Sequence, residues 1–305
     1  MEVKPLPYAD MPEFTEEVEG AKRIKTTGDE IGARLFKDIV YADVDGTPLH
    51  LQIIMPYTWN NQRQRRELPC IVYVQGSGWK KQDCFLNIPV NTRLAERGYV
   101  MAVVEYRHSG IAHFPAQVED VKNAVRFMRA NAEKYNVDPD KMVLMGNSSG
   151  GHSVMYTTLI SDEACKVNSF PGVSSEVKGL IDLYGATSVM ADDANPTTLN
   201  HHLPDSPEGL VMGADMRANP ELRKVLSVET NLTEDTVMPP TLIMHGTLDR
   251  IVNCTGSVAL YRKMKELGKE VSLYLIEGAD HGGPAFWIPE VLDVVDNFIQ
   301  DVINR

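Results

Sequence analysis

The chain has 305 residues, of which 30 are basic and 42 acidic, and its formal net charge is −12 at pH 7. Hydrophobic residues make up 43% and charged residues 24%, which is a globular composition and argues against disorder. The negative charge repels polyanions and anionic surfaces, so we expect neither nucleic acid nor a membrane as a partner.

The N-terminal 33 residues are polar and weakly patterned, and we expect residues 1–33 to form an arm that wraps the surface. This segment lacks the basic head and apolar run of a secretory signal, and no window of the chain approaches the roughly 18 apolar residues of a membrane span. The four cysteines show no Cys-x-x-Cys spacing that would indicate zinc or a redox pair. We therefore predict reduced thiols and a cytoplasmic location.

Two β-rich runs in LFKDIVYADVDGTPLHLQIIMP, which begins at Leu35, meet at the dipeptide Asp45-Gly46. This dipeptide supplies the positive φ angles of a tight turn, so the segment predicts a β-hairpin. The aspartates around it also resemble the start of a calcium loop. Such a loop needs further oxygen ligands between two helices, whereas strands flank this one, which favours the hairpin.

Beyond residue 69 the sequence alternates between short apolar runs and segments with helical spacing. Continuous apolar strands are typical of a parallel sheet covered on both faces, so the alternation predicts an α/β fold with a mostly parallel central sheet flanked by helices. The runs are CIVYV, YVMAVVEY, KMVLMG, VKGLIDLYG, PTLIMHG and VSLYLIEG. The helical stripes are Val118, Val121, Val125 and Met128, then Val291, Val294, Phe298 and Val302.

Residues 186–237 interrupt this alternation. They are rich in Asp, Asn, Pro and Met and are too long for a plain connection. We expect a helical insertion that acts as a cap, within a single domain over residues 1–305.

The run KMVLMG leads directly into Gly146-Asn147-Ser148-Ser149-Gly150, and the following residues can form a helix. A nucleophile on a sharp strand-to-helix turn needs glycine on both sides, because side chains there would collide with the sheet or the helix. The helix N-terminus also favours developing negative charge. We predict that Ser148 is the nucleophile.

A serine nucleophile requires a base, and the base requires an orienting acid. PTLIMHGTLDRIV places Asp249 after one apolar strand, and VSLYLIEGADHGG places His281 after the next. The order Ser, Asp, His, each beyond the C-terminal end of a strand, is the one that an α/β-hydrolase sheet requires. We therefore predict a triad of Ser148, Asp249 and His281.

Other residues near these motifs compete for the same roles. His152 lies one helical turn after Ser148 and is expected in the interior, and Asp280 adjoins His281 too closely to face its ring. His245 is expected to hold the Asp249 loop. The remaining histidines include the pair His201-His202, expected at the surface, and His108 and His113, in a loop that could face the site.

The loop Gln75-Gly76-Ser77-Gly78-Trp79 follows the first parallel strand, where hydrolases build the oxyanion hole. We assign the backbone N–H groups of Ser77 and Gly78 to this hole, together with that of Ser149. The alternative is an ordinary glycine-rich turn.

These motifs resemble those of α/β-hydrolase esterases of the hormone-sensitive-lipase and carbohydrate-esterase kind. QGSGW is similar to the family's H-G-G-G-W, and MGNSSGGH, HGTLDRIV and DHGG complete the resemblance to bacterial feruloyl or acetyl xylan esterases over residues 35–305. Three residues depart from the family pattern: Gln75 stands for a histidine, Ser77 for a glycine and Ser149 for an alanine. These departures leave the acyl and alcohol preference open.

The resemblance implies a serine carboxylic ester hydrolase that cleaves short acyl esters, acetyl or feruloyl groups on carbohydrates first, through an acyl-enzyme and without metal or organic cofactor. Its partner would be a small-molecule or oligosaccharide ester, and a homodimer is the base-rate expectation. Trp79 and Trp287 are candidates for a flat platform under a sugar ring, or for packing. A serine peptidase or amidase of the prolyl-oligopeptidase or arylformamidase type, and a noncatalytic ligand-binding homologue, remain as alternatives.

Overall fold

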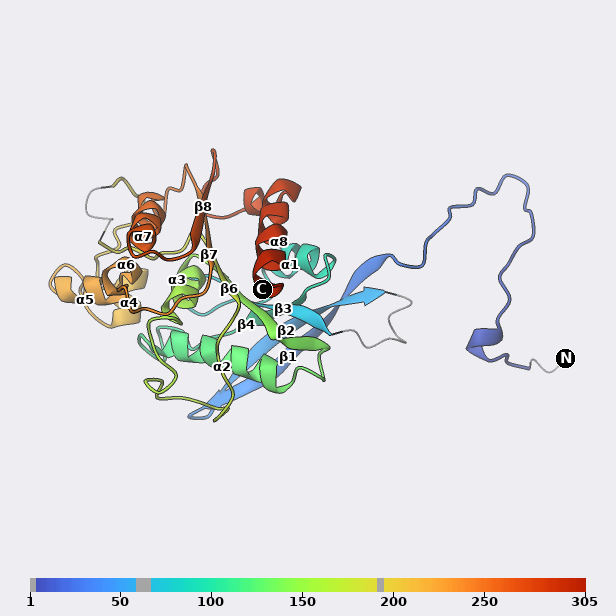
Figure 1. The fold of residues 1–305 in the computed structure, drawn as a ribbon, viewed down its shortest axis with the longest axis horizontal. Helices are drawn as coiled ribbons and strands as arrows, with labels where there is room; N and C mark the ends of the chain where they lie inside the picture. Colours follow the sequence, from blue (N-terminus) through green and yellow to red (C-terminus); the bar gives the residue numbers. More distant parts are fainter. Residues whose placement is uncertain (1–3, 59–66, 191–194) are drawn as a thin grey trace.

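A computed structural model describes residues 4–58, 67–190 and 195–305 of the chain. Its body is one eight-stranded sheet in the order β1-β2-β4-β3-β5-β6-β7-β8 (Figure 1). The strands from β4 to β8 pair in parallel, whereas β2 is antiparallel to both β1 and β4, so the predicted mostly parallel α/β sheet is confirmed. The strands are β1 (Ile31–Val44), β2 (Thr47–Thr58), β3 (Leu68–Val74), β4 (Val100–Val104), β5 (Val137–Asn147), β6 (Gly179–Leu183), β7 (Thr241–Gly246) and β8 (Val271–Ile276).

Each of the six predicted apolar runs forms a strand, from β3 to β8. Every residue of β4, β6 and β7 is buried, because helices cover both faces of the sheet at its centre. The predicted hairpin joins β1 and β2 through Asp45 and Gly46, which have φ angles of 52° and 79°. The Asp43 carboxylate accepts the Gly46 N–H at 2.9 Å, so it stabilises the turn.

Helices divide between the two faces of the sheet and form two core clusters. On one face α1 and α8 pack against the strands, and on the other α2, α3 and α7 do so (Figure 1). The predicted stripe of α2 is fully buried, whereas in α8 Val294 and Phe298 are only partly buried, because its apolar face is centred nearer Val295 and Ile299. The helices are η1 (Tyr8–Asp10), α1 (Ile88–Ala95), α2 (Ala116–Ala130), α3 (Ser149–Tyr156), α4 (Pro207–Met212), α5 (Pro220–Leu226), α6 (Val228–Asn231), α7 (Thr255–Glu266), η4 (Pro284–Trp287) and α8 (Pro289–Ile303).

The insertion between β6 and β7 contains the short helices α4, α5 and α6. Residues 191–194 of the predicted insertion lie outside the described residues. The insertion buries Val211, Met216 and Leu226 in a third apolar cluster with Trp79, which follows β3. This contact fixes the insertion against the loop where the oxyanion hole was expected.

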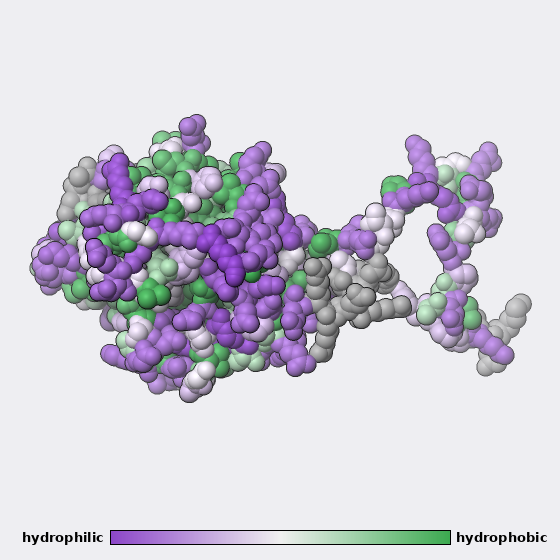
Figure 2. Space-filling view, in the orientation of Figure 1, coloured by the Kyte–Doolittle hydropathy of each residue, from purple (hydrophilic) through white to green (hydrophobic). Residues whose placement is uncertain are grey.

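The N-terminal arm does not wrap the surface. Residues 4–27 are exposed, and the arm runs away from the body (Figure 1). Its surface is mostly hydrophilic, with single apolar residues between charged ones (Figure 2), so it has no continuous apolar stripe to pack on the body. Of the predicted arm, residues 31–33 belong to β1, and residues 1–3 lie outside the described part of the chain.

No helix among the described residues has both the length and the apolar composition needed to cross a bilayer. All four cysteines are free thiols, of which Cys70 and Cys84 are buried and Cys165 and Cys254 are half-buried.

Candidate active site

Ser148 lies on the sharp turn between β5 and α3. Its φ of 52° and ψ of −127° are strained values for a residue with a side chain. Such backbone strain is common at active sites. The flanking glycines allow this turn, because a Cβ on Gly146 would lie 2.5 Å from the Gly150 carbonyl oxygen. A Cβ on Gly150 would lie 2.0 Å from the carbonyl oxygen of Val74. Glycine is therefore required at positions 146 and 150 because a side chain there would collide with the backbone.

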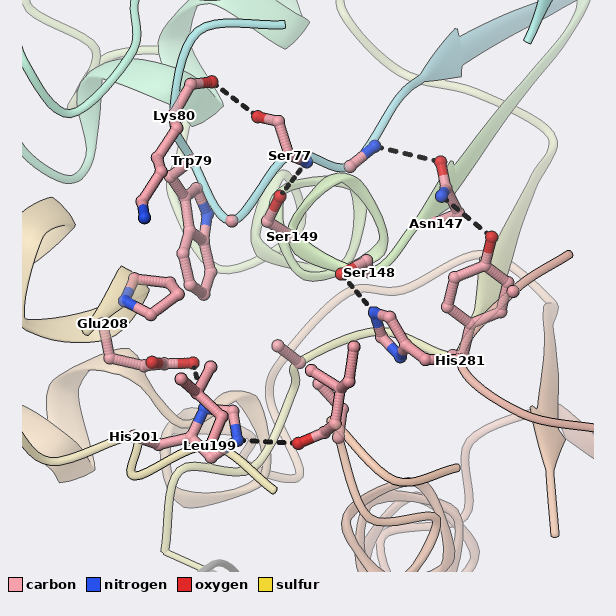
Figure 3. Close-up of a pocket in the computed structure, with 18 of the residues that line it drawn as sticks. Ser77, Trp79, Lys80, Asn147, Ser148, Ser149, Leu199, His201, Glu208 and His281 are labelled. Atoms are coloured by element: carbon pink, nitrogen blue, oxygen red, sulfur yellow. Dashed lines mark hydrogen bonds and ion pairs between the residues drawn. The ribbon is translucent and has the colours of Figure 1, made fainter. Parts of the chain in front are cut away.

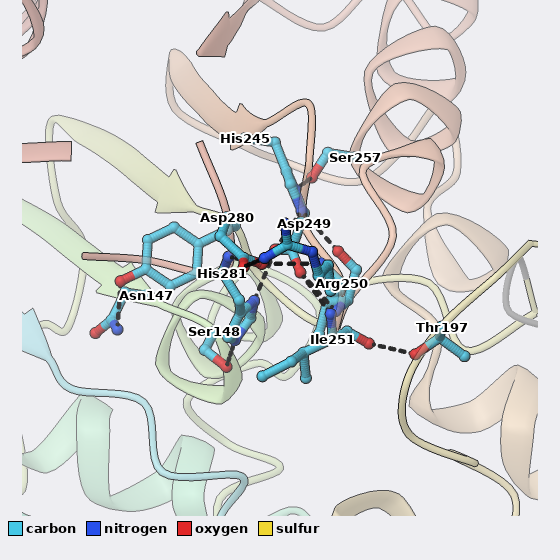
Figure 4. A network of polar contacts seen from close by, with 12 residues as sticks. Asn147, Ser148, Thr197, His245, Asp249, Arg250, Ile251, Ser257, Asp280 and His281 are labelled. Atoms are coloured by element: carbon cyan, nitrogen blue, oxygen red, sulfur yellow. Dashed lines mark hydrogen bonds and ion pairs between the residues drawn. The ribbon is translucent and has the colours of Figure 1, made fainter. Parts of the chain in front are cut away.

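The three predicted triad residues meet at one end of the sheet (Figure 4). Ser148 Oγ is 2.9 Å from His281 Nε2, and His281 Nδ1 is 2.7 Å from Asp249 Oδ2. Ser148 follows β5, Asp249 follows β7 and His281 follows β8, so each comes from the carboxyl end of a parallel strand. The structure therefore brings together the three residues that the sequence analysis proposed as a triad.

The Asp249 carboxylate is fully buried and accepts several hydrogen bonds. His245 Nε2 lies 3.1 Å from Oδ2, and the N–H groups of Ile251 and Val252 donate to Oδ1 at 2.9 and 2.8 Å. Burial raises the pKa of Asp249, but the hydrogen bonds from His245 and His281 outweigh it and hold this pKa below its ordinary value. The carboxylate is therefore ionised and fixed in orientation, and His245 holds the acid as expected.

His245 is itself held on its other side, where Nδ1 lies 2.7 Å from Ser257 Oγ on α7. Asp280, considered above as a rival acid, has a different position. It accepts the backbone N–H of His281 at 2.8 Å and pairs with the Arg250 guanidinium at 2.5 Å (Figure 4). Asp280 therefore braces the loops that carry Asp249 and His281.

The predicted oxyanion hole is only partly formed. The Ser77 N–H donates to the Ser149 hydroxyl at 2.9 Å, so Ser77 is not a free donor in this structure (Figure 3). This contact is possible because residue 149 is a serine and carries a hydroxyl group. The same hydroxyl lies 3.3 Å from the Tyr106 hydroxyl. Among the described residues, no acceptor takes the N–H of Gly78 or of Ser149, and both residues line the pocket. Two of the three assigned donors thus remain available.

Asn147, beside Ser148, connects the expected oxyanion loop to the rest of the site. Its Oδ1 accepts the Gly76 N–H at 3.0 Å and the Tyr73 hydroxyl at 2.8 Å, while its Nδ2 donates to the Tyr184 hydroxyl at 2.9 Å. The Tyr184 ring in turn packs edge-on against His281, with ring centroids 4.9 Å apart. Asn147, the variable position of the Gly-x-Ser motif, therefore has a structural role that the sequence analysis did not assign.

Ser148, His281 and Asn147 line a pocket of about 420 Å³ (Figure 3). The insertion supplies one side of it. The pocket is lined by residues 76–80, Leu86, Asn87, residues 147–149, Tyr184, Ala186, Leu199, His201, Pro207, Glu208, Ile251, Val252 and residues 281–283.

The two tryptophans behave differently from each other. Trp79 lines the pocket, but it is 1% exposed and its ring packs edge-on against His152 at 5.0 Å. Trp287 lies in the core against Tyr73 and α8 and does not line the pocket, so it is not a platform for a substrate in this structure. Trp287 is the last residue of the short helix η4 and is buried in the core.

The other histidines also separate by position. His152 is fully buried, bonds the Leu226 carbonyl oxygen at 2.8 Å, and burial lowers its pKa to about 4, so it is not the base. Neither His108 nor His113 lines the pocket. His201, expected at the surface, is instead 3% exposed and lies in the pocket wall beside Glu208. Sequence reasoning missed this pair because the insertion has no periodic pattern that places its side chains.

Within the described part of the chain, no group of three or more His, Cys, Asp or Glu side chains is arranged to hold a metal ion. The polar groups of the site form instead a continuous chain from carboxylate through imidazole to hydroxyl. Such a chain can remove a proton from the hydroxyl and return it to a leaving group.

Residues 56–264, about two thirds of the chain, match the BD-FAE family model. Esterase LipQ of Mycobacterium tuberculosis is 25% identical over 213 residues, which cover 68% of this chain and 48% of that protein. The chain spans about half the length of the curated relatives it matches.

Solved structures share the fold. A truncated carbohydrate esterase from gut microbiota superposes with a TM-score of 0.76 at 23% identity, covering 90% of this chain and 98% of that one. The thermophilic esterase Est2 of Thermogutta terrifontis, solved with propionate bound, gives a TM-score of 0.69 at 25% identity, covering 89% of this chain and 94% of that one.

Proposed function

Because the chain belongs to the BD-FAE family, we propose that it is a serine carboxylic ester hydrolase that cleaves short acyl esters. The observation that carries this proposal is the unbroken chain of contacts from Ser148 Oγ through His281 to the buried Asp249 carboxylate, at 2.9 and 2.7 Å. Its members come from three strand ends, and each contact lies within hydrogen-bond distance.

In this proposal His281 Nε2 removes the Ser148 proton as Oγ attacks the ester carbonyl carbon. Asp249 holds the imidazole with Nε2 facing the serine and stabilises the imidazolium that forms. His281 then gives its proton to the leaving alcohol, which departs and leaves an acyl group on Ser148. Water, activated by the same imidazole, attacks this acyl-enzyme and releases the acid.

The negative charge on the carbonyl oxygen is stabilised by the backbone N–H groups of Gly78 and Ser149, which have no acceptor within the described residues. One such donor is worth about 3 kcal/mol in a transition state. The N-terminal end of α3, where Ser149 is the first residue, adds the positive end of a helix dipole.

Acetyl or feruloyl groups on carbohydrates are the substrates that we propose, from the resemblance of the motifs. The pocket of about 420 Å³ lies in the usual range of small-molecule sites and mixes polar with apolar walls. The Thermogutta terrifontis esterase was solved with propionate, a short carboxylate, and the gut carbohydrate esterase shares the fold. Both support this choice.

Replacing Ser148 with Ala tests the proposal directly. We expect the parent to hydrolyse p-nitrophenyl acetate and to react with a fluorophosphonate probe at Ser148, and the variant to lose at least about 1000-fold in kcat and all labelling. Ser153→Ala is the matched control, because this serine lies on the same helix but not in the pocket. Hydrolysis by Ser148→Ala at the parent rate would refute the assignment.

A further inference from the structure

The pocket wall across from Ser148 is formed by Glu208 and His201 of the insertion (Figure 3). Both side chains are buried, at 2% and 3% exposure. His201 Nδ1 lies 2.9 Å from Glu208 Oε1, and His201 Nε2 lies 2.7 Å from the Ile251 carbonyl oxygen. The pair therefore joins the insertion to the loop that follows Asp249.

The geometry fixes the net charge of this pair. A carbonyl oxygen can only accept, so His201 Nε2 carries a hydrogen and donates it to Ile251. One further proton lies between Nδ1 and the carboxyl group, whether on the ring or on the acid. In either case the charges of His201 and Glu208 sum to zero. The pair therefore has little attraction for a cationic ligand.

Glu208 nevertheless has an unused acceptor. Its Oε2 is buried and has no hydrogen-bond donor among the described residues. A carboxyl group has more acceptor positions than the one that His201 fills, and leaving a buried acceptor unpaired costs free energy. On the same side of the pocket the Trp79 Nε1 donor also lacks a partner within the described residues. A wall with a spare acceptor and a spare donor suits a ligand with hydroxyl groups, which both donate and accept.

We propose that Glu208 is a specificity-determining residue that binds a hydroxyl group on the alcohol part of the ester. The inference rests on the proposed function and assigns to one residue the recognition of a polyhydroxylated alcohol part. Because the His201–Glu208 pair has no net charge, it favours a neutral hydroxyl group as the hydrogen-bond donor over a charged ammonium group. An acetyl group carries no hydrogen-bond donor, so with acetate esters the donor comes from the alcohol.

The test compares two acetates that differ in hydroxyl groups, a monoacetate of methyl β-xylopyranoside and cyclohexyl acetate, with p-nitrophenyl acetate as reference. We expect the parent to favour the xyloside in kcat/KM by about tenfold, which corresponds to one hydrogen bond of about 1.4 kcal/mol. In Glu208→Gln, which keeps the size and a carbonyl for His201, we expect this preference to fall about tenfold. Trp287→Phe, a buried change outside the pocket, should keep the parent preference.

Thermal unfolding and fluorophosphonate labelling of Ser148 show whether each variant is folded. A parent without preference for the xyloside acetate overturns the inference, and this result does not need the variant to fold. A folded Glu208→Gln variant with the parent preference, or one that loses the same factor on all three esters, also overturns it. A parent that neither hydrolyses p-nitrophenyl acetate nor reacts with the probe refutes the proposed function instead.

Discussion

At the scale of single residues, Ser149 connects the nucleophile turn to the oxyanion loop. Its hydroxyl accepts the Ser77 N–H at 2.9 Å, and the loop is held independently by the Asn147 contact with the Gly76 N–H at 3.0 Å. Ser149→Ala should therefore free the Ser77 N–H while the loop stays in place. A third donor near the carbonyl oxygen stabilises the transition state, so we expect kcat for p-nitrophenyl acetate to rise several-fold.

The same variant should lose about 1 kcal/mol of unfolding free energy, because the half-buried hydrogen bond from the Ser77 N–H to the Ser149 hydroxyl is lost. Steady-state kinetics and urea unfolding measure both effects. Ser153→Ala serves for comparison, since its hydroxyl donates to the Ser149 carbonyl oxygen at 2.9 Å but does not touch the loop. A fall of tenfold or more in kcat for Ser149→Ala would show instead that the hydroxyl positions the loop.

The sequence could bring the three proposed triad residues to one place because each follows a recognisable strand, and the carboxyl ends of parallel strands meet at one edge. It does not predict the bond between Ser77 and Ser149, whose residues are 72 positions apart and belong to different turns. Nor does it place Trp287, because a tryptophan a few residues after the proposed base can lie in the core instead of the pocket.

At the scale of helices and strands, continuous apolar runs predict the central strands correctly because both of their faces are buried. The insertion has no such pattern, and α4 to α6 are only four to seven residues long. Their positions depend on the apolar contact with Trp79, which local propensity does not encode. The wall formed by His201 and Glu208 therefore emerges only from tertiary packing.

Strand β6 carries a buried acid, Asp182, that has no role in the proposed reaction. It is fully buried, and neither of its oxygens has a hydrogen-bond donor of normal geometry among the described residues. Burial raises its pKa to about 7, and His245 and the backbone N–H of Gly185 lower it only in part. The folded state thus holds a proton that the unfolded state releases near pH 4.

This difference makes stability fall with pH. Between about pH 4 and pH 7 the folded chain binds one proton more at Asp182, so the free energy of unfolding decreases as pH rises through this window. In Asp182→Asn this contribution is absent. We expect the free energy of unfolding of the variant, relative to that of the parent, to be higher at pH 8 than at pH 5 by on the order of 3 kcal/mol. Urea unfolding at both pH values measures this difference. Asp29→Asn, on the exposed arm, is the control. An unchanged difference between Asp182→Asn and the parent at the two pH values would contradict the prediction.

At the scale of the whole molecule, the chain combines a compact body with an arm that leaves it. The arm exposes large apolar side chains, among them Phe14 at 63% and Ile24 at 92%. Five acidic residues and no basic one lie within residues 10–19. Residues 4–27 are exposed, so apolar side chains such as Phe14 and Ile24 can bury surface in another chain.

The homodimer expected from the sequence remains a prediction, and the arm is where we expect its contacts. Deleting residues 1–28 should leave the unfolding temperature of the dilute monomer and its hydrolysis of p-nitrophenyl acetate unchanged, because residues 4–27 contribute nothing to the described core. The full chain should instead elute as a dimer, with an unfolding temperature that rises with protein concentration, since association stabilises the folded state by mass action. Light scattering after size exclusion measures the mass of both forms. A truncated chain that stays dimeric would place the interface on the body, and a monomeric full chain would mean that the arm binds no second copy.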